Sequence, residues 1–405
     1  MTTDRYDVVV LGVGGMGAAA LDHLAGRGAK VIGIEQDDVP SERGSSSGDT
    51  RVIRKAYFED SRYVPLLERA YVAWRELEAH AREPLLETTG CINLGPADHP
   101  AIVGVRESAK HHHLAHEVLD AAAVKARFPA FVPNANDVGV FEAEGGFLRV
   151  EACTRAHARR AVERGATLRT RTRVTALSLD GGAGGGKGGA PVRVTLEDGT
   201  VVEADRAVVS AGAWLASAPA FRPIAARLPL VVQRQVQLWF RPLDAHATRP
   251  GQLPAFIHFG THSGDGAAGS ADRIFYGIPL HGERGEEPAL KVCRHGGGES
   301  TTADGLDRVL RDDDVEQVRA WMRDQLPAGN GELLRSRVCM YTTTPDGHFV
   351  IGALREHPQV VVLGGFSGHG YKMASVIGEI AADLTTTGGT PFDLGLFDPA
   401  RFERA

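Results

Sequence analysis

A glycine-rich turn inside residues 6–36 constrains the fold of this chain more than any other feature. The apolar run VVVL at residues 8–11 is typical of a strand that is buried on both faces. Gly12, Gly14 and Gly17 then give the spacing G-x-G-x-x-G. The three glycines predict a tight turn out of the strand, a backbone that a ligand can approach closely, and a helix packed against the strand.

The same stretch predicts a nucleotide site. The helix is expected to end near Gly28, and its first N–H groups would hold a pyrophosphate because the helix dipole favours negative charge there. A second strand over residues 30–35 ends in Glu35, where a carboxylate accepts hydrogen bonds from a ribose hydroxyl. This acid disfavours a 2′-phosphate. FAD and NAD both remain, and the alternative is a turn that only packs a helix on a sheet.

The size and charge of the chain narrow its class. Its 405 residues exceed one typical core, so we expect two domains. A net charge of −6 gives no reason to expect nucleic acid or an anionic membrane as a partner, and no apolar run is long enough to cross a bilayer. The four cysteines are scattered and the chain enters its first strand at once. These features predict no disulfide framework, no signal peptide and a cytoplasmic location.

Periodicity predicts the later elements. Helices are expected over residues 62–82, 101–116, 120–128, 150–165, 313–326 and 373–386. Strands are expected at residues 167–178, 192–197, 206–210, 348–352 and 360–365, with a mainly antiparallel set between residues 228 and 327. Glycine-rich loops are expected at residues 180–190, at the tip of a ribbon, and at residues 264–270. The strand–glycine–helix pattern near the end of the chain predicts a first domain built from separated pieces.

Four histidines, His111, His112, His113 and His116, lie near the end of the predicted helix at residues 101–116. His112 and His116 are four residues apart and could share a metal ion. No cysteine and no convincing acidic partner completes the set. We therefore expect a solvated helix face and no metal site.

Five stretches carry a resemblance to a known family: YDVVVLGVGGMG, GDTRVIRKAY, VVSAGAW, VCMYTTTPDGHF and GGFSGHGYKMASVIGEIAADL. Over nearly its whole length the chain resembles the monomeric sarcosine oxidase family, which includes N-methyl-L-tryptophan oxidase, pipecolate oxidase and fructosyl amine oxidases. The resemblance implies a monomer with an α/β fold. A glutathione-reductase-like, Rossmann-type FAD-binding domain would carry an inserted α+β substrate domain on a mixed, largely antiparallel sheet.

The resemblance also implies the division of the chain. We expect the FAD-binding domain to comprise residues 1–85, 146–220 and 328–405. The substrate domain is expected to comprise residues 86–145 and 221–327.

By the same resemblance, FAD is attached through a thioether to Cys339. Attachment needs a thiolate, which nearby cations would favour. A buried, inert cysteine is the alternative. The residues implied around the cofactor are Gly12, Gly14, Gly15, Met16, Gly17, Glu35, Gln36, Ser45, Thr50, Arg51, Val174, Gly212, Trp214, Cys339, Gly365, Gly368, Gly370 and Lys372.

Arg54 and Lys372 resemble the family's ligands for the substrate carboxylate. A guanidinium binds a carboxylate as a fork, and an ammonium binds it as a point charge. Arg51 resembles a residue beside the flavin ring, and Tyr276 and Tyr341 resemble tyrosines of the substrate cavity. Salt bridges on a solvated loop are the alternative for the arginines, and core packing is the alternative for the tyrosines.

Lys291 resembles the lysine at the face of the flavin that reacts with oxygen. An ammonium there would stabilise the superoxide anion as it forms. His295 and His369 resemble histidines near the flavin and the substrate. A lysine on the open face of a strand and satisfied structural histidines are the alternatives.

The resemblance implies oxidation of the C–N bond of a secondary amino acid, such as sarcosine or N-methyl-L-tryptophan, to an imine, with reduction of O2 to H2O2. Oxidation of L-pipecolate, L-proline or a fructosyl amino acid stays open, as does a flavin dehydrogenase that uses another acceptor. In other classes, an NAD-dependent dehydrogenase and a non-catalytic flavoprotein stay open. One departure concerns Ser46 and Ser47, where sarcosine oxidases have two histidines. Pipecolate-oxidase-like members also use serine in that loop.

Overall fold

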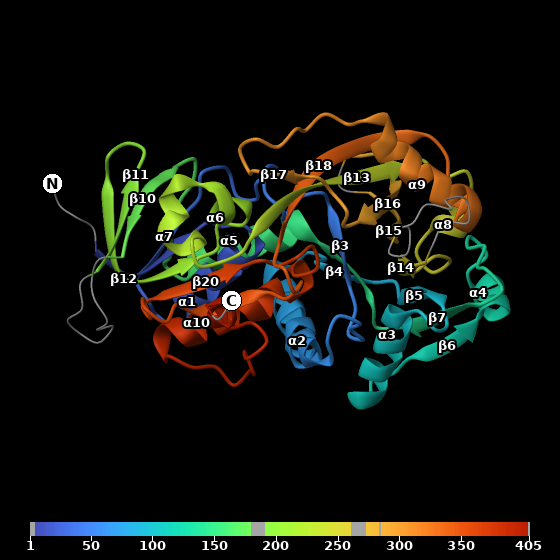
Figure 1. Cartoon of the computed structure of the whole chain (residues 1–405), viewed down its shortest axis with the longest axis horizontal. Helices are drawn as coiled ribbons and strands as arrows, with labels where there is room; N and C mark the ends of the chain where they lie inside the picture. Colours follow the sequence, from blue (N-terminus) through green and yellow to red (C-terminus); the bar gives the residue numbers. More distant parts are fainter. Residues whose placement is uncertain (1–4, 180–190, 261–272, 283–284, 404–405) are drawn as a thin grey trace.

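The computed structural model describes residues 5–179, 191–260, 273–282 and 285–403. Within these residues the strands form three sheets, of eight, nine and three strands. The two large sheets lie toward opposite ends of an elongated molecule, and the small sheet lies between them (Figure 1).

The strands of the eight-stranded sheet are β1 (Arg5–Leu11), β2 (Val31–Ile34), β9 (Thr167–Arg169), β10 (Val174–Ser178), β11 (Val192–Leu196), β12 (Val201–Val209), β19 (Val350–Ala353) and β20 (Val360–Gly364). β1 is parallel to β2 on one side and to β12 on the other. The order is β10-β11-β12-β1-β2-β9, and β20 pairs with the C-terminal half of β12. Both faces of β1 are buried: Val8 and Val10 enter one core cluster, and Val9 and Leu11 enter another.

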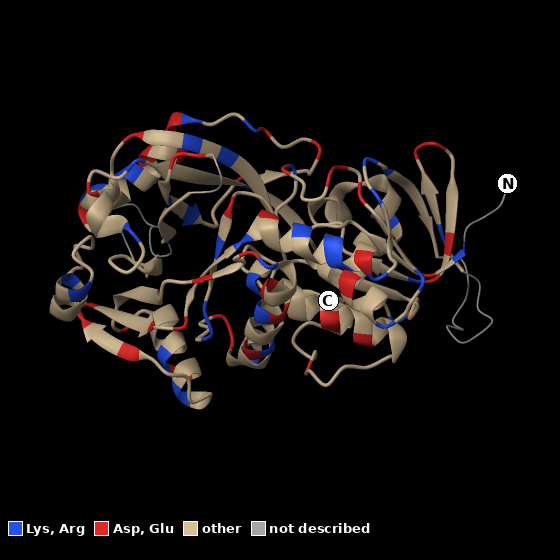
Figure 2. Cartoon of the chain, turned by 180° about the vertical axis from the view of Figure 1, so that it is seen from behind, with Lys and Arg blue, Asp and Glu red and all other residues tan. Residues whose placement is uncertain are grey.

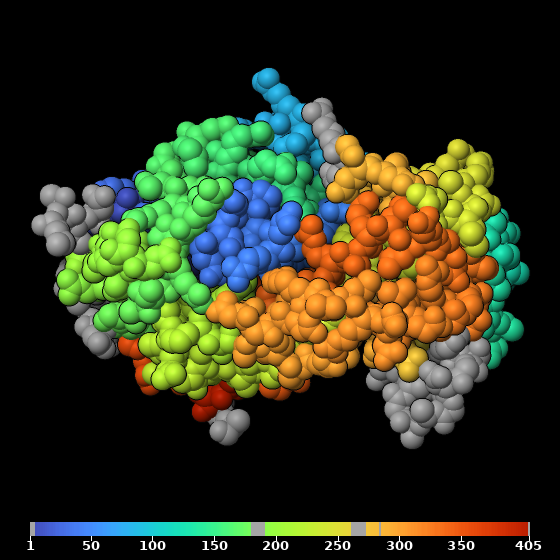
Figure 3. Space-filling model, turned by 90° about the horizontal axis from the view of Figure 1, so that it is seen from above, coloured from blue at the N-terminus to red at the C-terminus, as the bar shows by residue number. Residues whose placement is uncertain are grey.

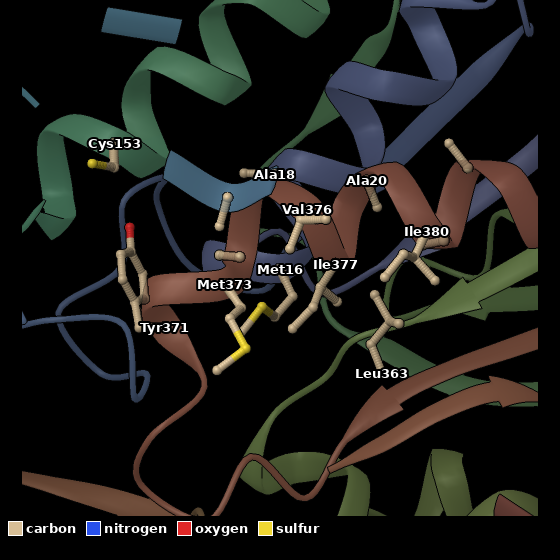
Figure 4. Close-up of a cluster of buried hydrophobic side chains, with 14 of the residues drawn as sticks. Met16, Ala18, Ala20, Cys153, Leu363, Tyr371, Met373, Val376, Ile377 and Ile380 are labelled. Atoms are coloured by element: carbon tan, nitrogen blue, oxygen red, sulfur yellow. The ribbon is translucent and has the colours of Figure 1, made fainter. Parts of the chain in front are cut away.

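The helices around this sheet are α1 (Gly15–Gly26), α2 (Val64–Ala81), α5 (Val150–Glu163), α6 (Ala213–Ser217), α7 (Arg222–Ala225) and α10 (Ala374–Thr386). α1 and α10 lie on one face of the sheet, and α6 and α7 lie on the other (Figure 1). α1 and α10 cross so closely that a Cβ on Gly378 would lie 2.4 Å from the backbone carbonyl carbon of Ala19. Met16, Met373 and Ile377 share the apolar core between these helices (Figure 4). Packing therefore returns the end of the chain to the first strand–helix unit.

The strands of the nine-stranded sheet are β5 (Cys91–Pro96), β6 (Glu117–Asp120), β7 (Asp137–Glu142), β13 (Val231–Phe240), β14 (Ala255–Phe259), β15 (Ile274–His281), β16 (Ala289–His295), β17 (Ser300–Thr301) and β18 (Leu333–Thr343). The order is β17-β13-β16-β15-β14-β5-β7-β6, and β18 pairs with β13. Its strand pairs are antiparallel except for β14 with β5. β18 thus joins the second sheet, although residues 333–343 fall within a segment that we expected in the FAD-binding domain.

Four helices lie beside the second sheet: α3 (Pro100–His111), α4 (Ala121–Arg127), α8 (Ala245–Thr248) and α9 (Asp312–Gln325). α9 begins with three aspartates, whose charge is favourable at a helix N-terminus, and it buries Trp321 and Met322. The small sheet has the order β3-β8-β4. Its strands are β3 (Thr50–Ile53), β4 (Leu86–Thr88) and β8 (Gly146–Arg149). Short 3-10 turns are η1 (Ser61–Tyr63), η2 (Pro219–Phe221), η3 (Pro327–Gly329), η4 (Tyr371–Met373) and η5 (Pro399–Phe402).

The predicted helices are confirmed with small shifts of their ends, except for the one expected over residues 101–116. That prediction was wrong in extent, because α3 ends at His111 and His113 has a left-handed backbone with a φ of 53°. His112 and His116 therefore do not share a helical face. The prediction of a single strand over residues 167–178 was also wrong.

That segment forms two strands, β9 and β10, at opposite edges of the eight-stranded sheet. The chain turns between them at Arg171, which has a φ of 50°. β10 and β11 then form the predicted antiparallel ribbon. The loops expected at residues 180–190 and 264–270 lie outside the described residues.

Charged residues of both signs are spread over the ribbons of Figure 2. Many form ion pairs, as Arg69 does with Glu76 and Glu379. In the part of the chain that the structure describes, no helix has the length and apolar character that crossing a bilayer requires.

Candidate active site

A cavity is lined by residues of both large sheets and their loops. From the eight-stranded sheet and the helices and loops around it, its lining includes the predicted residues Gly12, Gly14, Gly15, Met16, Glu35, Gln36, Ser45, Val174, Gly212 and Trp214. The lining also includes the predicted residues Arg51, Arg54, Tyr276, His295, Tyr341, Gly365, Gly368, His369, Gly370 and Lys372, of which Tyr276, His295 and Tyr341 lie on strands of the second sheet. The fold thus brings together residues that are far apart in the sequence.

Four predicted residues, Gly17, Thr50, Lys291 and Cys339, are absent from this lining. Gly17 lies under the glycine-rich turn, where a Cβ would be 1.9 Å from the carbonyl oxygen of Gly12. Lys291 and Cys339 are buried behind the cavity wall, at 0% and 3% exposure.

The glycine-rich turn and its acid fit the phosphate and ribose groups of FAD. Gly12 has a φ of 87°, and a Cβ there would lie 2.7 Å from the carbonyl oxygen of Ser210, so the turn requires glycine. α1 begins directly after Gly14, which places the N–H groups of its first turn at the cavity. Glu35 accepts a hydrogen bond of 2.8 Å from the backbone nitrogen of Val13. Burial raises the pKa of Glu35.

Ser46 and Ser47 occupy the two loop positions at which this chain departs from the histidines of sarcosine oxidases. Ser46 lines the cavity, and its Oγ accepts a hydrogen bond of 3.1 Å from the backbone nitrogen of Gly15. Ser47 is buried, and its Oγ donates to the carbonyl oxygen of Gly44 at 3.0 Å. In Figure 3 the blue segment around residues 40–50 reaches the surface between green and orange parts of the chain.

Arg51 holds this serine loop together. Its guanidinium donates to the carbonyl oxygens of Ser45 at 2.9 Å, Ser47 at 2.6 Å and Thr50 at 2.8 Å. Because backbone carbonyls satisfy these donors, Arg51 supplies a fixed positive charge at the cavity wall.

Lys291 is held by three acceptors. Its Nζ donates to the carbonyl oxygens of Gly48 at 2.6 Å and Thr50 at 3.0 Å, and to Oε1 of Gln237 at 2.6 Å. Burial, followed by the positive charge of Arg51, lowers the pKa of Lys291 to about 7. The alternative of a lysine on the open face of a strand is excluded by its burial.

Cys339 is a free, buried cysteine. Its Sγ accepts a hydrogen bond of 3.2 Å from Nε2 of Gln237. The next three residues of β18 line the cavity: Met340, Tyr341 and Thr342. Cys339 is therefore adjacent in sequence to the residues of the cavity wall.

Arg54 and Lys372, the predicted carboxylate ligands, both line the cavity. Arg54 is 1% exposed and packs on the rings of Tyr57 and Phe58, at 4.4 Å and 4.8 Å from the ring centroids. Nζ of Lys372 donates to the hydroxyl of Tyr57 at 3.2 Å and to the carbonyl oxygen of His369 at 2.5 Å. Burial, followed by the charge of Arg54, lowers the pKa of Lys372 to about 7.

Glu59 also lines the cavity, although it was not among the residues predicted from the sequence. Its carboxylate lies 3.3 Å from Arg54 and 3.8 Å from Nδ1 of His369. Burial alone would raise the pKa of Glu59, but the charges of Arg54 and Lys372 hold it below its ordinary value. The available signal was an acid five residues after Arg54, in the segment that follows GDTRVIRKAY.

The histidines and tyrosines form two contacts near these charges. Nδ1 of His295 lies 3.1 Å from the hydroxyl of Tyr341, and Nδ1 of His369 lies 2.7 Å from the hydroxyl of Tyr57. Burial lowers the pKa of His295 to about 4 and that of His369 to about 3, so both rings are neutral at pH 7. Tyr276 packs edge-on to His295. Among the described residues, no group of three or more histidine, cysteine or acidic side chains is arranged to hold a metal ion.

Comparison with known proteins identifies the family of the chain. The model of the FAD dependent oxidoreductase family matches residues 7–384. The chain is 36% identical to monomeric sarcosine oxidase of Streptomyces avermitilis, over 99% of this chain and 98% of that protein. It is 35% identical to N-methyl-L-tryptophan oxidase of Citrobacter koseri, over 98% of this chain and 99% of that protein. The resemblance predicted from five stretches is therefore confirmed.

Solved structures share the fold. NikD, an unusual amino acid oxidase essential for nikkomycin biosynthesis, has a TM-score of 0.82 at 23% identity over 98% of both chains. L-proline dehydrogenase from P. horikoshii has a TM-score of 0.81 at 22% identity, over 100% of this chain and 99% of that chain. The predicted Rossmann-type FAD-binding fold with a second, mixed sheet is confirmed by this likeness.

Proposed function

The chain belongs to the FAD-dependent oxidoreductase family, and on this premise we propose that it oxidises the C–N bond of an N-methyl or other secondary amino acid. One observation carries the proposal: Arg54 and Lys372 lie in the same cavity as the glycine-rich turn. A buried guanidinium and a nearby ammonium are the groups that bind a carboxylate.

FAD, when bound, supplies the acceptor for hydride from the carbon next to the amine nitrogen. In the proposal, the N–H groups after Gly14 hold its pyrophosphate and Glu35 holds its ribose. Arg51 would lie beside the ring and supply a fixed charge. These assignments rest on the glycine cradle and on the donors and acceptors described above.

Arg54 and Lys372 would orient the substrate by its carboxylate. Glu59 is the present partner of Arg54, so an incoming carboxylate competes with it. His295 and His369 are neutral and leave the positive charge to the arginine and the lysine. The neutral ring of His295 can accept a hydrogen bond from an amine without repelling it, whereas both nitrogens of His369 already have partners in Tyr57 and Gly347.

The substrate side chain meets an apolar wall in this proposal. Phe58, Ile257 and Ile274 also line the cavity. Such a wall favours an amino acid with an apolar group on its α-carbon, such as N-methyl-L-tryptophan, over sarcosine, which has none. The apolar ring of L-pipecolate is the second candidate that this wall supports.

We further propose that O2 is the electron acceptor and that FAD is attached through Cys339. The Lys291 ammonium is buried and fixed by three acceptors, as electrostatic stabilisation of an oxygen anion requires. Cys339 forms no disulfide, and its sulfur accepts a hydrogen bond from Nε2 of Gln237. A negatively charged sulfur is the form that attacks carbon.

A peroxide assay tests the proposed activity. Purified protein is mixed with sarcosine, N-methyl-L-tryptophan, L-pipecolate, L-proline and fructosyl-valine, and flavin bleaching and H2O2 are measured. We expect the strongest response with N-methyl-L-tryptophan or L-pipecolate. Bleaching without peroxide would point to another electron acceptor, and no bleaching with any of the five would contradict the proposed substrate class.

Replacement of Lys291 by methionine tests the oxygen step. Lys291→Met should slow reoxidation of reduced flavin by O2 at least about tenfold, because the charge that stabilises the oxygen anion is removed. The rate of flavin reduction by substrate should stay unchanged. Lys55→Met, in a lysine that pairs with exposed Glu144, is the control. Equal reoxidation rates in both variants would reject the role of Lys291.

We also propose a cytoplasmic monomer. Four free, buried cysteines support a reducing compartment, and light scattering of the purified protein would test the monomer.

The proposed FAD-binding domain comprises residues 1–85, 146–220 and 344–405, and the proposed substrate domain comprises the rest of the chain. The boundary moves from 328 to 344 because β18 pairs with β13.

A further inference from the structure

Gln237 joins two of the residues discussed above, and no motif in the sequence points to it. It lies in β13 and is 1% exposed. Its Oε1 accepts hydrogen bonds from Lys291 at 2.6 Å and from Arg51 at 3.4 Å. Its Nε2 donates to Sγ of Cys339 and to the carbonyl oxygen of Ser47, both at 3.2 Å.

The neighbours fix the orientation of this amide. Lysine and arginine side chains only donate hydrogen bonds, so the atom that faces Lys291 and Arg51 must be the oxygen. The nitrogen then faces the sulfur of Cys339 and the backbone oxygen. The opposite orientation would place N–H groups against an ammonium, in a buried site where an unpaired polar group is costly.

The backbone leaves space for the same amide. Gly48 has a φ of 94°, and a Cβ there would lie 2.1 Å from Oε1 of Gln237. Gly48 also offers its carbonyl oxygen to Lys291. Three acceptors match the three N–H groups of an ammonium and favour its charged form. Removal of Oε1 would leave one of these N–H groups without its partner.

We propose that Gln237 is a positioning residue that holds the Lys291 ammonium and the Cys339 sulfur in one hydrogen-bonded unit. Attachment of the flavin and its reaction with O2 then depend on the same amide. The inference rests on the proposed roles of Cys339 and Lys291. In attachment, the S–H bond and one C–H bond of the flavin methyl are replaced by a C–S bond. The two hydrogens, with their electrons, reduce O2 to H2O2.

Two substitutions separate the two contacts. Gln237→Leu removes all the side-chain hydrogen bonds of Gln237, including those with Lys291 and Cys339, whereas Gln237→Glu keeps an acceptor for Lys291 but places a carboxylate near the sulfur. FAD is added to apoprotein, and the flavin that precipitates with acid-denatured protein is followed over time. Both variants should attach flavin at least about tenfold more slowly than the wild type, because the N–H donor to the sulfur is lost.

The pH profile of flavin reoxidation by O2 gives the second readout. The rate should be highest where Lys291 is charged and should fall as the pH rises through its pKa. Gln237→Leu should move this fall to lower pH and Gln237→Glu should move it to higher pH, each by about one unit, since an acceptor or a negative charge favours the ammonium. Non-specific structural damage does not predict shifts of opposite sign.

Gln235→Leu is the matched control. Gln235 is a buried glutamine two residues earlier on β13, and its Nε2 has no partner in the described structure. The Gln235→Leu variant should keep the flavin attachment rate and the pH profile of the wild type. Wild-type attachment in both Gln237 variants, or shifts of the profile in one direction, would overturn the proposal.

The outcomes also separate this proposal from the proposed function. If Gln237→Leu fails to fold, as thermal unfolding would reveal, Gln237→Glu alone decides by the sign of its pH shift. If the wild type holds only non-covalent flavin, the assignment of Cys339 fails. The pH profiles then still decide for or against Gln237 through Lys291.

Discussion

At the scale of single residues, the site depends on two buried cations whose charged groups differ in shape, the guanidinium of Arg54 and the ammonium of Lys372. Arg54 is fixed by two aromatic rings and by the carbonyl oxygen of Ala56. This leaves its fork in a defined plane, whereas Lys372 is a point charge that titrates near neutrality. The two residues therefore support different predictions.

Arg54→Lys keeps the charge and removes the fork. We expect KM for the substrate to rise about tenfold or more with a smaller change in kcat, because one charge-assisted hydrogen bond to the carboxylate is lost. Arg62→Lys is the matched control, since Arg62 pairs with Asp60 on the surface. Steady-state kinetics decide: equal KM values for the two variants would contradict a carboxylate-binding role for Arg54.

Lys372 predicts a pH dependence of carboxylate binding. Burial and Arg54 lower its pKa from the ordinary value to about 7, so the ammonium is present below pH 7 and is lost above it. The Kd of a carboxylate without an amine, such as cyclohexanecarboxylate, should be constant below pH 7 and should rise above it. Flavin absorbance can report binding. Lys372→Arg should abolish the rise, because a guanidinium stays charged; persistence of the rise would assign it to another group.

At the scale of elements, the position of the glycine-rich turn depends on how closely α1 and α10 cross. Gly378→Ala places a Cβ 2.4 Å from backbone atoms of Ala19, which cannot move aside as a side chain can. We expect a loss of about 1–3 kcal/mol in the free energy of unfolding, measured with urea on the FAD-bound protein. Gly389→Ala, which meets no atom within 4 Å, should change stability little. Similar losses in both would refute the packing argument.

The element scale also shows where prediction from sequence fails. The first strand, the turn and α1 are correct because their signals are local and consecutive. The end of α3 and the break between β9 and β10 were missed, because His113 and Arg171 adopt left-handed backbones that no glycine marks. Gln237 was missed for another reason: its partners come from other strands, and its own strand reads as ordinary.

At the scale of the whole molecule, one cavity is lined by both large sheets, so FAD should couple their stability. In Cys339→Ala, where FAD cannot be attached, free FAD at 100 times its Kd should stabilise the protein by about 2.7 kcal/mol. Calorimetry should show a single transition that moves to higher temperature with FAD concentration. Two transitions, of which FAD moves only one, would contradict a common cofactor site.

The sequence by itself determined the strand–turn–helix unit and a nucleotide site, which follow from glycines and an acid at fixed spacings. Its resemblance to a known family implied FAD and many of the residues that line the cavity. Only the tertiary structure decided that Lys291 and Cys339 lie behind the wall, that Glu59 faces Arg54 and that Gln237 bridges the two buried groups. The physical reason is that burial and hydrogen-bond partners depend on strands paired across the sheet, which sequence spacing does not encode.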